Sequence, residues 1–552
     1  MRQIVDVVPN KSMYVPSEPV EIIISVENTD DTPFAGTLVV SFCQLETVID
    51  KQAIPVALQQ GEIAHRTVTY VPPADPMRGY GIDVHLGDGG GEVVATASGA
   101  FDVLDRWSQA PRYGFLSSFG PNMDSAAIEA AAASLRRFHL NVVQFYDWMW
   151  RHYCLLPPED DFTDALGRRI SLQVVRDSIS AMQRIGAAAF AYGAVYGAEP
   201  EYTEAHPELV LVDKDGKPYS LAELFFIMDI APESPWTAMI VNEFAETIRV
   251  LDFDGIHLDQ YGFPKGTVWT RTCESRDLAR DFPLLIDAAR EAVRREKPSA
   301  GVIFNAVENW PIATVAPTTQ DAIYIEVWPP DEAYADLRRL IQDAKRLGRG
   351  QQVILAAYLA PFLEEPHAPE SEAAALLATA VIASSGGFHL LLGERNGILC
   401  DPYYPKFGTL RDEFVPRLRA YYDYLVRYEE WLTMPTVVDW DFAIDHTMVT
   451  TSAIAGKIWL IARTTASERI VHLVDFRGQS DDRWNAPRTP GSRDPETITL
   501  DLPTTSSIVR AFVISPEEPT LRDLSAQPTA AGISVDVPIA GPWTTVVVRL
   551  LG

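Results

Sequence analysis

Residues 253–262 read Phe-Asp-Gly-Ile-His-Leu-Asp-Gln-Tyr-Gly, and they carry the strongest fold signal in the sequence. Side chains alternate between the two faces of a strand, so Ile256 and Leu258 share one face while His257 and Asp259 share the other. An apolar outer face and a polar inner face that ends in a carboxylate are typical of a strand in a parallel barrel, where functional groups stand at the carboxyl ends. The surrounding sequence should then contain further strands of this kind, separated by helices.

Eight such apolar runs occur between residues 112 and 431. They cover residues 113–118, 141–147, 187–195, 253–259, 301–307, 321–328, 352–358 and 387–392. Apolar residues three or four apart lie between some of these runs, in 125–138, 173–185 and 282–296, and this spacing predicts helices. Eight strand–helix units in about 320 residues predict a (β/α)8 barrel. The third connection, 196–251, is long, and we expect it to form part of an active-site rim.

The two ends of the chain have a different pattern. Before residue 108, short alternating segments such as 20–26, 37–42 and 66–71 are separated by clusters of Pro, Gly and Asp, which predicts six or seven strands in an immunoglobulin-like β-sandwich. Short strands are predicted again at 457–462, 469–473, 507–514 and 544–551, with a Pro- and Asp-rich loop at 480–495. The expected domains are an immunoglobulin-like β-sandwich at 1–108, a catalytic barrel at 109–431 and a C-terminal β-sandwich at 432–552.

Composition and charge exclude several classes of protein. The 552 residues contain 46 Lys and Arg against 75 Asp and Glu, a formal net charge of −29, so nucleic acid and membrane surfaces are not expected partners. The 47% hydrophobic content is typical of a folded globular chain. The ten His contain no HxH or HExxH pair, and there is no P-loop, so we expect no metal and no cofactor. The glycine-rich stretch 87–91 is interpreted as a turn in a β-rich context.

The sequence also bears on the compartment. Cys43, Cys154, Cys273 and Cys400 are scattered without a CxxC pair, which fits a reducing compartment. Residues 1–6 contain no apolar run, and no stretch of about 18 apolar residues occurs anywhere, so neither a secretory signal nor a membrane span is predicted. We therefore expect a cytoplasmic location, or a secreted one if an upstream signal was removed.

A second carboxylate follows the same alternation in the predicted sixth strand. Tyr324, Glu326 and Trp328 share its inner face, and the apolar setting between two rings should raise the pKa of Glu326. A carboxyl group of raised pKa is what a general acid near neutral pH needs, while Asp259 is expected to be ionised. Two such carboxylates suit glycoside hydrolysis, although their separation in sequence cannot distinguish retention from inversion. If Glu326 is not the acid, Glu308 or Glu394 would be the next candidate.

Several other residues at predicted strand ends are candidates for sugar binding. The run Gln144–His152 interleaves rings with charged groups and contributes Tyr146, Asp147 and His152, a composition that suits a sugar site and an aromatic core alike. The further candidates at strand ends are His257, Gln260, Asn305 and Trp328. Glu394 and Asp401, after the eighth strand, could equally bind sugar hydroxyls or be ordinary loop charges. The flanking sandwiches are expected to be scaffolds that supply no residue at the scissile bond.

At these residues the chain resembles glycoside hydrolase family 66, the dextranases and cycloisomaltooligosaccharide glucanotransferases. The resemblance rests on runs spread over the whole predicted barrel, namely 113–116, 144–152, 253–259, 304–307, 325–328 and 401–405. It implies retaining endo-hydrolysis of α-1,6-linked glucan in dextran or isomaltooligosaccharides. By motif, Asp259 corresponds to the nucleophile and Glu326 to the acid/base.

Two departures from the family pattern favour a hydrolase. Family enzymes are usually exported, whereas no signal is recognised here, and no predicted loop is long enough for the carbohydrate-binding module that the glucanotransferases carry inside the barrel. The alternatives are an exo-acting α-glucosidase or α-galactosidase, a cyclising transglycosylase on the same glucan, and a non-catalytic glycan-binding protein. The presence of both Asp259 and Glu326 opposes the last.

Overall fold

A curled, mixed sheet of eleven strands forms the centre of the computed structural model, which describes the chain except residues 1, 76, 367, 492–495, 505–507 and 551–552. Its parallel part follows the predicted runs. The strands are β8 (Tyr113–Leu116), β9 (Val142–Phe145), β12 (Ala188–Ala194), β16 (Gly255–Asp259), β19 (Gly301–Val307), β20 (Ala322–Glu326), β21 (Val353–Ala356) and β22 (Phe388–His389). They pair in this order, each parallel to the next.

The predicted eighth strand, 387–392, is divided into two pieces. β22 pairs with β21, and β23 (Leu392–Gly393) pairs with β8 at the other edge of the parallel run. One segment therefore contacts both edges of the run. β24 (Gly397–Ile398) and β25 (Gly408–Thr409) then extend the sheet in antiparallel fashion. A continuous eighth strand was a wrong expectation, because the hydrogen bonds of this segment are shared between two neighbours.

Helices cover the parallel strands, as the apolar spacing predicts. They are α1 (Ser125–Arg137), α2 (Leu172–Arg184), α4 (Pro235–Leu251), α5 (Leu278–Glu296), α7 (Tyr334–Leu347), α9 (Pro369–Ser384) and α10 (Val415–Arg427). The helix predicted at 282–296 begins earlier, where the Asp277 side chain accepts a hydrogen bond from the amide of Ala279 and caps the first turn. In the described part of the chain, no helix is long and apolar enough to cross a membrane.

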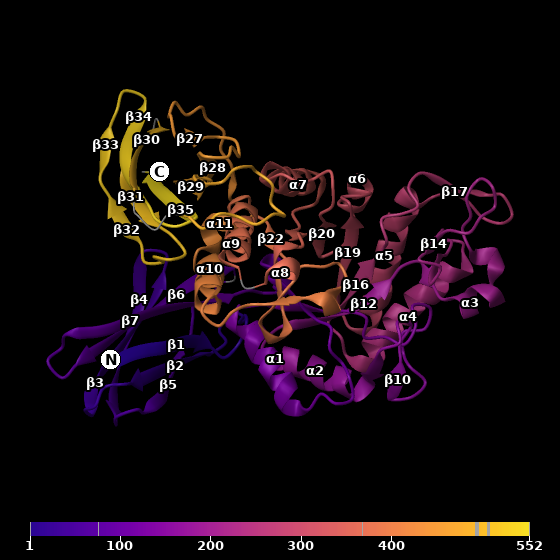
Figure 1. Ribbon diagram of the computed structural model, residues 1–552, viewed down its shortest axis with the longest axis horizontal. Coiled ribbons are helices and arrows are strands. Elements are labelled where there is room, and N and C mark those ends of the chain that lie inside the picture. The colour runs from indigo at the N-terminus through magenta and orange to yellow at the C-terminus, as the bar shows by residue number, and fades with distance from the viewer. Residues whose placement is uncertain (1, 76, 367, 492–495, 505–507, 551–552) are drawn as a thin grey trace.

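The third connection projects at one end of the molecule (Figure 1). It contains β13 (Gly197–Ala198), α3 (Pro200–Ala205), β14 (Ser220–Leu221) and β15 (Phe225–Ile227), and the three strands form a small sheet of their own before α4 begins. Both termini lie in the β-rich regions at the opposite end of the molecule (Figure 1).

The N-terminal region contains seven strands in two sheets. One sheet holds β1 (Arg2–Pro9), β2 (Val20–Asn28) and β5 (Ile63–Tyr70), and the other holds β3 (Phe34–Gln44), β4 (Thr47–Leu58), β6 (Arg78–Asp88) and β7 (Val93–Val103). Buried residues of both sheets, including Ile22, Leu38 and Val84, form one hydrophobic core. The glycine-rich stretch 87–91 covers the last two residues of β6 and the turn that leads to β7, as its interpretation as a turn predicts.

The C-terminal region is also built from two sheets. The larger sheet contains β26 (Val438–Asp439), β27 (Val449–Thr450), β28 (Ile458–Thr464), β29 (Glu468–Asp475), β31 (Ile508–Ile514), β32 (Arg522–Leu524) and β35 (Trp543–Leu550), and the smaller contains β30 (Glu496–Pro503), β33 (Ala526–Pro528) and β34 (Gly532–Ile539). Residues 480–491 of the predicted loop contain no helix or extended strand, and its remainder, 492–495, lies outside the described residues, as do 507 and 551 of the predicted strands.

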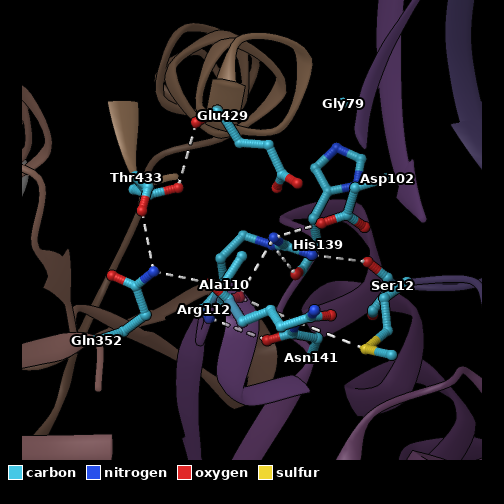
Figure 2. A network of polar contacts seen from close by, with 12 residues as sticks. Ser12, Gly79, Asp102, Ala110, Arg112, His139, Asn141, Gln352, Glu429 and Thr433 are labelled. Atoms are coloured by element: carbon cyan, nitrogen blue, oxygen red, sulfur yellow. Dashed lines mark hydrogen bonds and ion pairs between the residues drawn. The ribbon is translucent and has the colours of Figure 1, made fainter. Parts of the chain in front are cut away.

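A buried polar network joins the N-terminal sheets to the central sheet (Figure 2). The guanidinium of Arg112, just before β8, lies 2.7 Å from a carboxylate oxygen of Asp102 on β7 and donates to the carbonyl oxygens of His139 (2.7 Å) and Ser12 (3.2 Å). Glu429, in the short helix α11 (Glu429–Leu432), is also buried there. Burial and the neighbouring charge of Asp102 raise the pKa of Glu429 well above its usual range.

Candidate active site

A cavity of about 390 Å³ opens at the carboxyl ends of the parallel strands. Its lining comes from the ends of six of the strands and the residues just after them, from the third connection and from residues 402–404. The predicted residues that line it are Tyr146, Asp147, His152, His257, Asp259, Gln260, Asn305, Glu326 and Trp328. The structure therefore brings together nine candidates that are spread over almost two hundred residues of sequence, as the strand-end argument predicts.

One amide group connects the two carboxylates at the centre of the cavity. Asn305 Nδ2 donates to Asp259 Oδ1 and to Glu326 Oε2, each at 2.7 Å. Two oxygens that each lie 2.7 Å from one nitrogen can be at most about 5.4 Å apart. Parallel pairing places Asn305 between them, because β19 lies between β16 and β20 in the sheet. Asn305 thus holds the carboxyl groups close together and neutralises neither.

Each carboxylate accepts a further hydrogen bond on the side away from Asn305. The hydroxyl of Tyr192 donates to Asp259 Oδ2 at 2.8 Å. The indole Nε1 of Trp328 donates to Glu326 Oε1 at 2.9 Å. The sequence therefore identifies both carboxylates and places Trp328 beside Glu326, although as a sugar-binding candidate, and it does not identify Tyr192.

Burial makes both carboxyl groups harder to ionise. Burial and the charge of Glu326 raise the pKa of Asp259 to about 7, although the hydrogen bonds from Tyr192 and Asn305 oppose the shift. Burial also raises the pKa of Glu326, against the donors Asn305 and Trp328. The sequence predicts a raised pKa for Glu326 and an ionised Asp259, and it does not anticipate that burial also raises the pKa of Asp259. Two like charges this close in a dry site favour one shared proton, and the pair titrates as a unit.

Two of the predicted sugar-binding residues, one on β16 and one just after it, form hydrogen bonds within the protein. His257 is 1% exposed, its Nδ1 lies 2.8 Å from the Tyr113 hydroxyl, and burial lowers its pKa to about 3, so the ring is neutral. The Gln260 side chain accepts from the Gly262 amide at 2.6 Å and donates to the Asn305 carbonyl oxygen at 3.2 Å. Both residues line the cavity, yet their hydrogen bonds fix the strand ends.

Asp147 and His152 are positioned by residues that the sequence does not identify. Arg168 donates to the carbonyl oxygen of Asp147 at 2.7 Å and lies 3.5 Å from its carboxylate. The backbone amide and the Nδ1 of His152 both lie 2.9 Å from Glu199 Oε1, and its ring lies 4.1 Å from that of Phe225. Glu199 and Phe225 belong to the third connection, so this connection does form part of the rim.

Tyrosines form much of the remaining wall. The rings of Tyr146 and Tyr404 are stacked with centroids 4.3 Å apart, and the Tyr404 hydroxyl lies 3.0 Å from that of Tyr324. Tyr192, Tyr358, Tyr403 and Tyr404 all line the cavity and were not among the candidates. One signal could have identified Tyr192, because it occupies the position on β12 that pairs with His257 on β16.

Three acidic candidates lie outside the cavity. Glu394 is fully buried, and its Oε1 accepts from the hydroxyls of Ser117 (2.9 Å) and Ser118 (2.8 Å), so it ties the segment after β23 to the end of β8. Asp401 caps the turn at Tyr403, whose amide donates to it at 2.8 Å, and does not line this cavity. Glu308 is exposed and pairs with Lys265. Within the described residues, no three His, Cys, Asp or Glu side chains are grouped to hold a metal ion.

Comparisons with known proteins identify the family of the chain and agree with its fold. The model of glycosyl hydrolase family 66 matches residues 9–547. A cycloisomaltooligosaccharide glucanotransferase of Niallia circulans is 26% identical over 377 residues, 63% of this chain and 37% of that protein. A dextranase of Streptococcus salivarius is 20% identical over 503 residues, 77% of this chain and 60% of that protein. The chain thus spans about a third to two thirds of the length of these relatives.

A solved structure also matches along almost the whole chain. It is a Paenibacillus sp. cycloisomaltooligosaccharide glucanotransferase complexed with cycloisomaltoheptaose, with a TM-score of 0.90 at 20% identity, over 99% of this chain and 100% of that one. An Anoxybacillus α-amylase is more distant, with a TM-score of 0.51 at 11% identity over 81% of this chain and 99% of that one. These likenesses concern the fold.

Proposed function

Because the chain belongs to glycosyl hydrolase family 66, we propose that it is a retaining endo-glycosidase that cleaves α-1,6-glucosidic linkages of dextran or isomaltooligosaccharides. The observation that carries the proposal is the single amide of Asn305 between Asp259 and Glu326. A separation of at most about 5.4 Å suits the roughly 5–5.5 Å of retaining enzymes, whereas inverting enzymes need about 6.5–9.5 Å to admit a water molecule.

In the first step, the carboxylate of Asp259 attacks the anomeric carbon and Glu326 gives its proton to the departing glycosidic oxygen. A glycosyl ester of Asp259 and a free chain end result. The Tyr192 hydroxyl and the Asn305 amide hold the attacking carboxylate in one orientation. This division of labour requires the proton of the pair to lie on Glu326 and to leave Asp259 ionised.

In the second step, Glu326, now ionised, takes a proton from a water molecule, which attacks the ester and releases the sugar with its original configuration. If the hydroxyl of a second sugar enters in place of water, the product is a transferred or cyclised glucan. The name of the dextranase relative supports hydrolysis, and the names of the glucanotransferase relatives support transfer as the alternative on the same intermediate.

The proposed mechanism assigns a part to each region of the chain. The eight parallel strands, with a segment that reaches both edges, support a (β/α)8 barrel at 109–431 that carries the catalytic pair. The paired sheets at each end support β-sandwiches at 1–108 and 432–552.

Product analysis on dextran tests the proposal. An endo-hydrolase gives a ladder of isomaltooligosaccharides, an exo-enzyme gives one small sugar, a cyclising enzyme gives products without reducing ends, and a binding protein gives none. Proton NMR of the first product formed should show the α-anomer. A first product in the β form would contradict retention.

A further inference from the structure

A second cavity, of about 430 Å³, lies beside the catalytic one. The two cavities share Trp328, Tyr358 and Pro402 in their linings, so they adjoin along one wall. The far wall of the second cavity comes from the C-terminal region, which contributes Arg483 and Asn485. Its volume lies within the usual range of ligand sites.

The wall from the C-terminal region is firmly fixed to the loops that follow β20 and β21. Residues 481–488, named here the docked segment, contain Trp484, which is 4% exposed and whose Nε1 donates to the Asp331 carbonyl oxygen at 2.7 Å. The Ala360 amide donates to Asn485 Oδ1 at 2.8 Å. The Arg488 amide donates to the Glu370 carbonyl oxygen at 3.0 Å. These hydrogen bonds hold the docked segment in a fixed position against the second cavity.

The wall that the two cavities share includes hydrogen-bond partners of the proposed acid. Glu326 Oε2 faces Asn305 and, through it, Asp259, whereas its Oε1 accepts from Trp328, which lines both cavities. Tyr358, the other ring in both linings, is a further hydrogen-bond partner of Glu326. The second cavity therefore adjoins the first beside the partners of the group that is proposed to protonate the leaving-group oxygen.

The lining of the second cavity has the chemistry of a sugar site. The rings of Trp328 and Tyr358 stand nearly perpendicular, at 72° with centroids 6.2 Å apart, and Leu363 is 51% exposed at the rim. Asn485 and Arg483 supply donors, and the Arg483 guanidinium lies 2.8 Å from Glu332. Rings for the apolar face of a sugar, with donors for its hydroxyls, suit a neutral carbohydrate.

We propose that the second cavity binds the glucosyl units on the leaving-group side of the scissile bond, and that the docked segment thereby sets the preference for chain length. The same cavity would bind the acceptor sugar during transfer. This inference rests on the proposed function. It assigns a binding part to the C-terminal region while leaving the scissile bond to the central sheet.

The test compares the double variant Arg483→Ala/Asn485→Ala with the control Arg522→Ala. Arg522 is likewise an exposed arginine of the C-terminal region in an ion pair, with Glu518, but it does not line either cavity. Two substrates are used: isomaltohexaose, which fills the leaving-group side with sugar, and an aryl α-isomaltoside, which does not.

We expect the double variant to lose about tenfold in kcat/KM on isomaltohexaose and less than about twofold on the aryl glycoside. When isomaltose is added as an acceptor to the reaction with the aryl glycoside, the double variant should also form a smaller fraction of transfer product than the wild type. The control should match the wild type in all three measurements.

Equal losses on both substrates, or unchanged kcat/KM on isomaltohexaose with an unchanged transfer fraction, would overturn the inference and leave the proposed function standing. A wild-type protein that cleaves neither substrate would overturn the proposed function itself, and the inference with it.

Discussion

The two β-rich ends of the chain have similar architecture but different relations to the site. No residue of the N-terminal sheets lines either cavity, and this region meets the centre through the buried network of Asp102 and Arg112. The C-terminal region instead extends the docked segment over the loops after β20 and β21, where it lines the second cavity. The N-terminal sheets therefore support the central sheet, whereas the C-terminal region also lines a cavity. The docked segment makes this difference, since loops tolerate change and carry function.

The comparison predicts that the largest effect on turnover comes from the centre of the molecule. Asp259→Asn should lower kcat on dextran by roughly 10⁴-fold or more, because the nucleophile is lost while the fold stays intact. Circular dichroism checks the fold. With Asp259→Ala and an activated substrate, added azide should restore part of the rate and give a glycosyl azide of inverted configuration. An Asp259→Asn enzyme with most of its activity would contradict the assignment.

The next effect separates the acid from the nucleophile. Glu326→Gln should lower kcat/KM on dextran by about 10³-fold, yet spare glycosyl fluorides, which need little protonation when they leave. A raised pKa keeps Glu326 protonated at lower pH, and activity should fall as pH rises through that pKa. The variant should therefore lack the basic limb of the pH profile.

Equal losses on dextran and fluoride would assign the acid to another group. The matched control is Glu308→Gln, which replaces an exposed carboxylate outside the cavity. It should keep the activity and a basic limb, which moves to lower pH because the charge of Glu308 contributes to the raised pKa of Glu326.

A smaller effect is expected at the residue that joins the pair. Asn305→Ala removes a donor from both carboxylates, so the pKa of Asp259, already raised to about 7, should rise further. Because Asp259 must be ionised to attack, the acidic limb of the profile should move to higher pH, with about a 10–100-fold loss below neutral pH. If activity falls by the same factor at every pH and the acidic limb stays in place, Asn305 does not affect the pKa of Asp259.

The smallest effect should appear at the N-terminal junction and should concern stability alone. Burial raises the folded-state pKa of Glu429 above its unfolded value, so its contribution to stability is present at low pH and is lost as pH rises toward the folded pKa. Glu429→Gln cannot ionise. It should match the wild type near pH 4 and exceed it by about 1–2 kcal/mol in free energy of unfolding near pH 8.

Urea unfolding at both pH values measures this difference, with the exposed Glu92→Gln as control. The chain-length preference should be unchanged in Glu429→Gln and changed in the Arg483→Ala/Asn485→Ala variant. This result would show that only the C-terminal region affects substrate binding. A Glu429→Gln protein that is less stable than the wild type at pH 8 would show that the carboxylate is ionised in the fold.

Sequence patterns predicted the parallel strands and the meeting of Asp259 and Glu326 at one edge of the sheet, because both depend on local alternation. Asp259 and Glu326 stand on inner faces that two-residue periodicity identifies directly. Glu394 was misjudged for the opposite reason: its partners Ser117 and Ser118 are some 277 positions away, and no local pattern shows a buried carboxylate that is already satisfied. Tyr192 and Glu199 are set by neighbouring strands and by a loop, and the second cavity depends on a loop that has no periodic signal.

The docked segment also has a consequence for the order of events during synthesis. The described residues that line the catalytic cavity lie between positions 144 and 404, so all of them are synthesised before the C-terminal region. The second cavity needs Arg483, Trp484 and Asn485, and cannot exist until these residues have been made and have docked. During synthesis, the residues of the catalytic cavity are therefore made first and those proposed to bind the departing sugar last, and a chain clipped before position 483 would lack the second cavity.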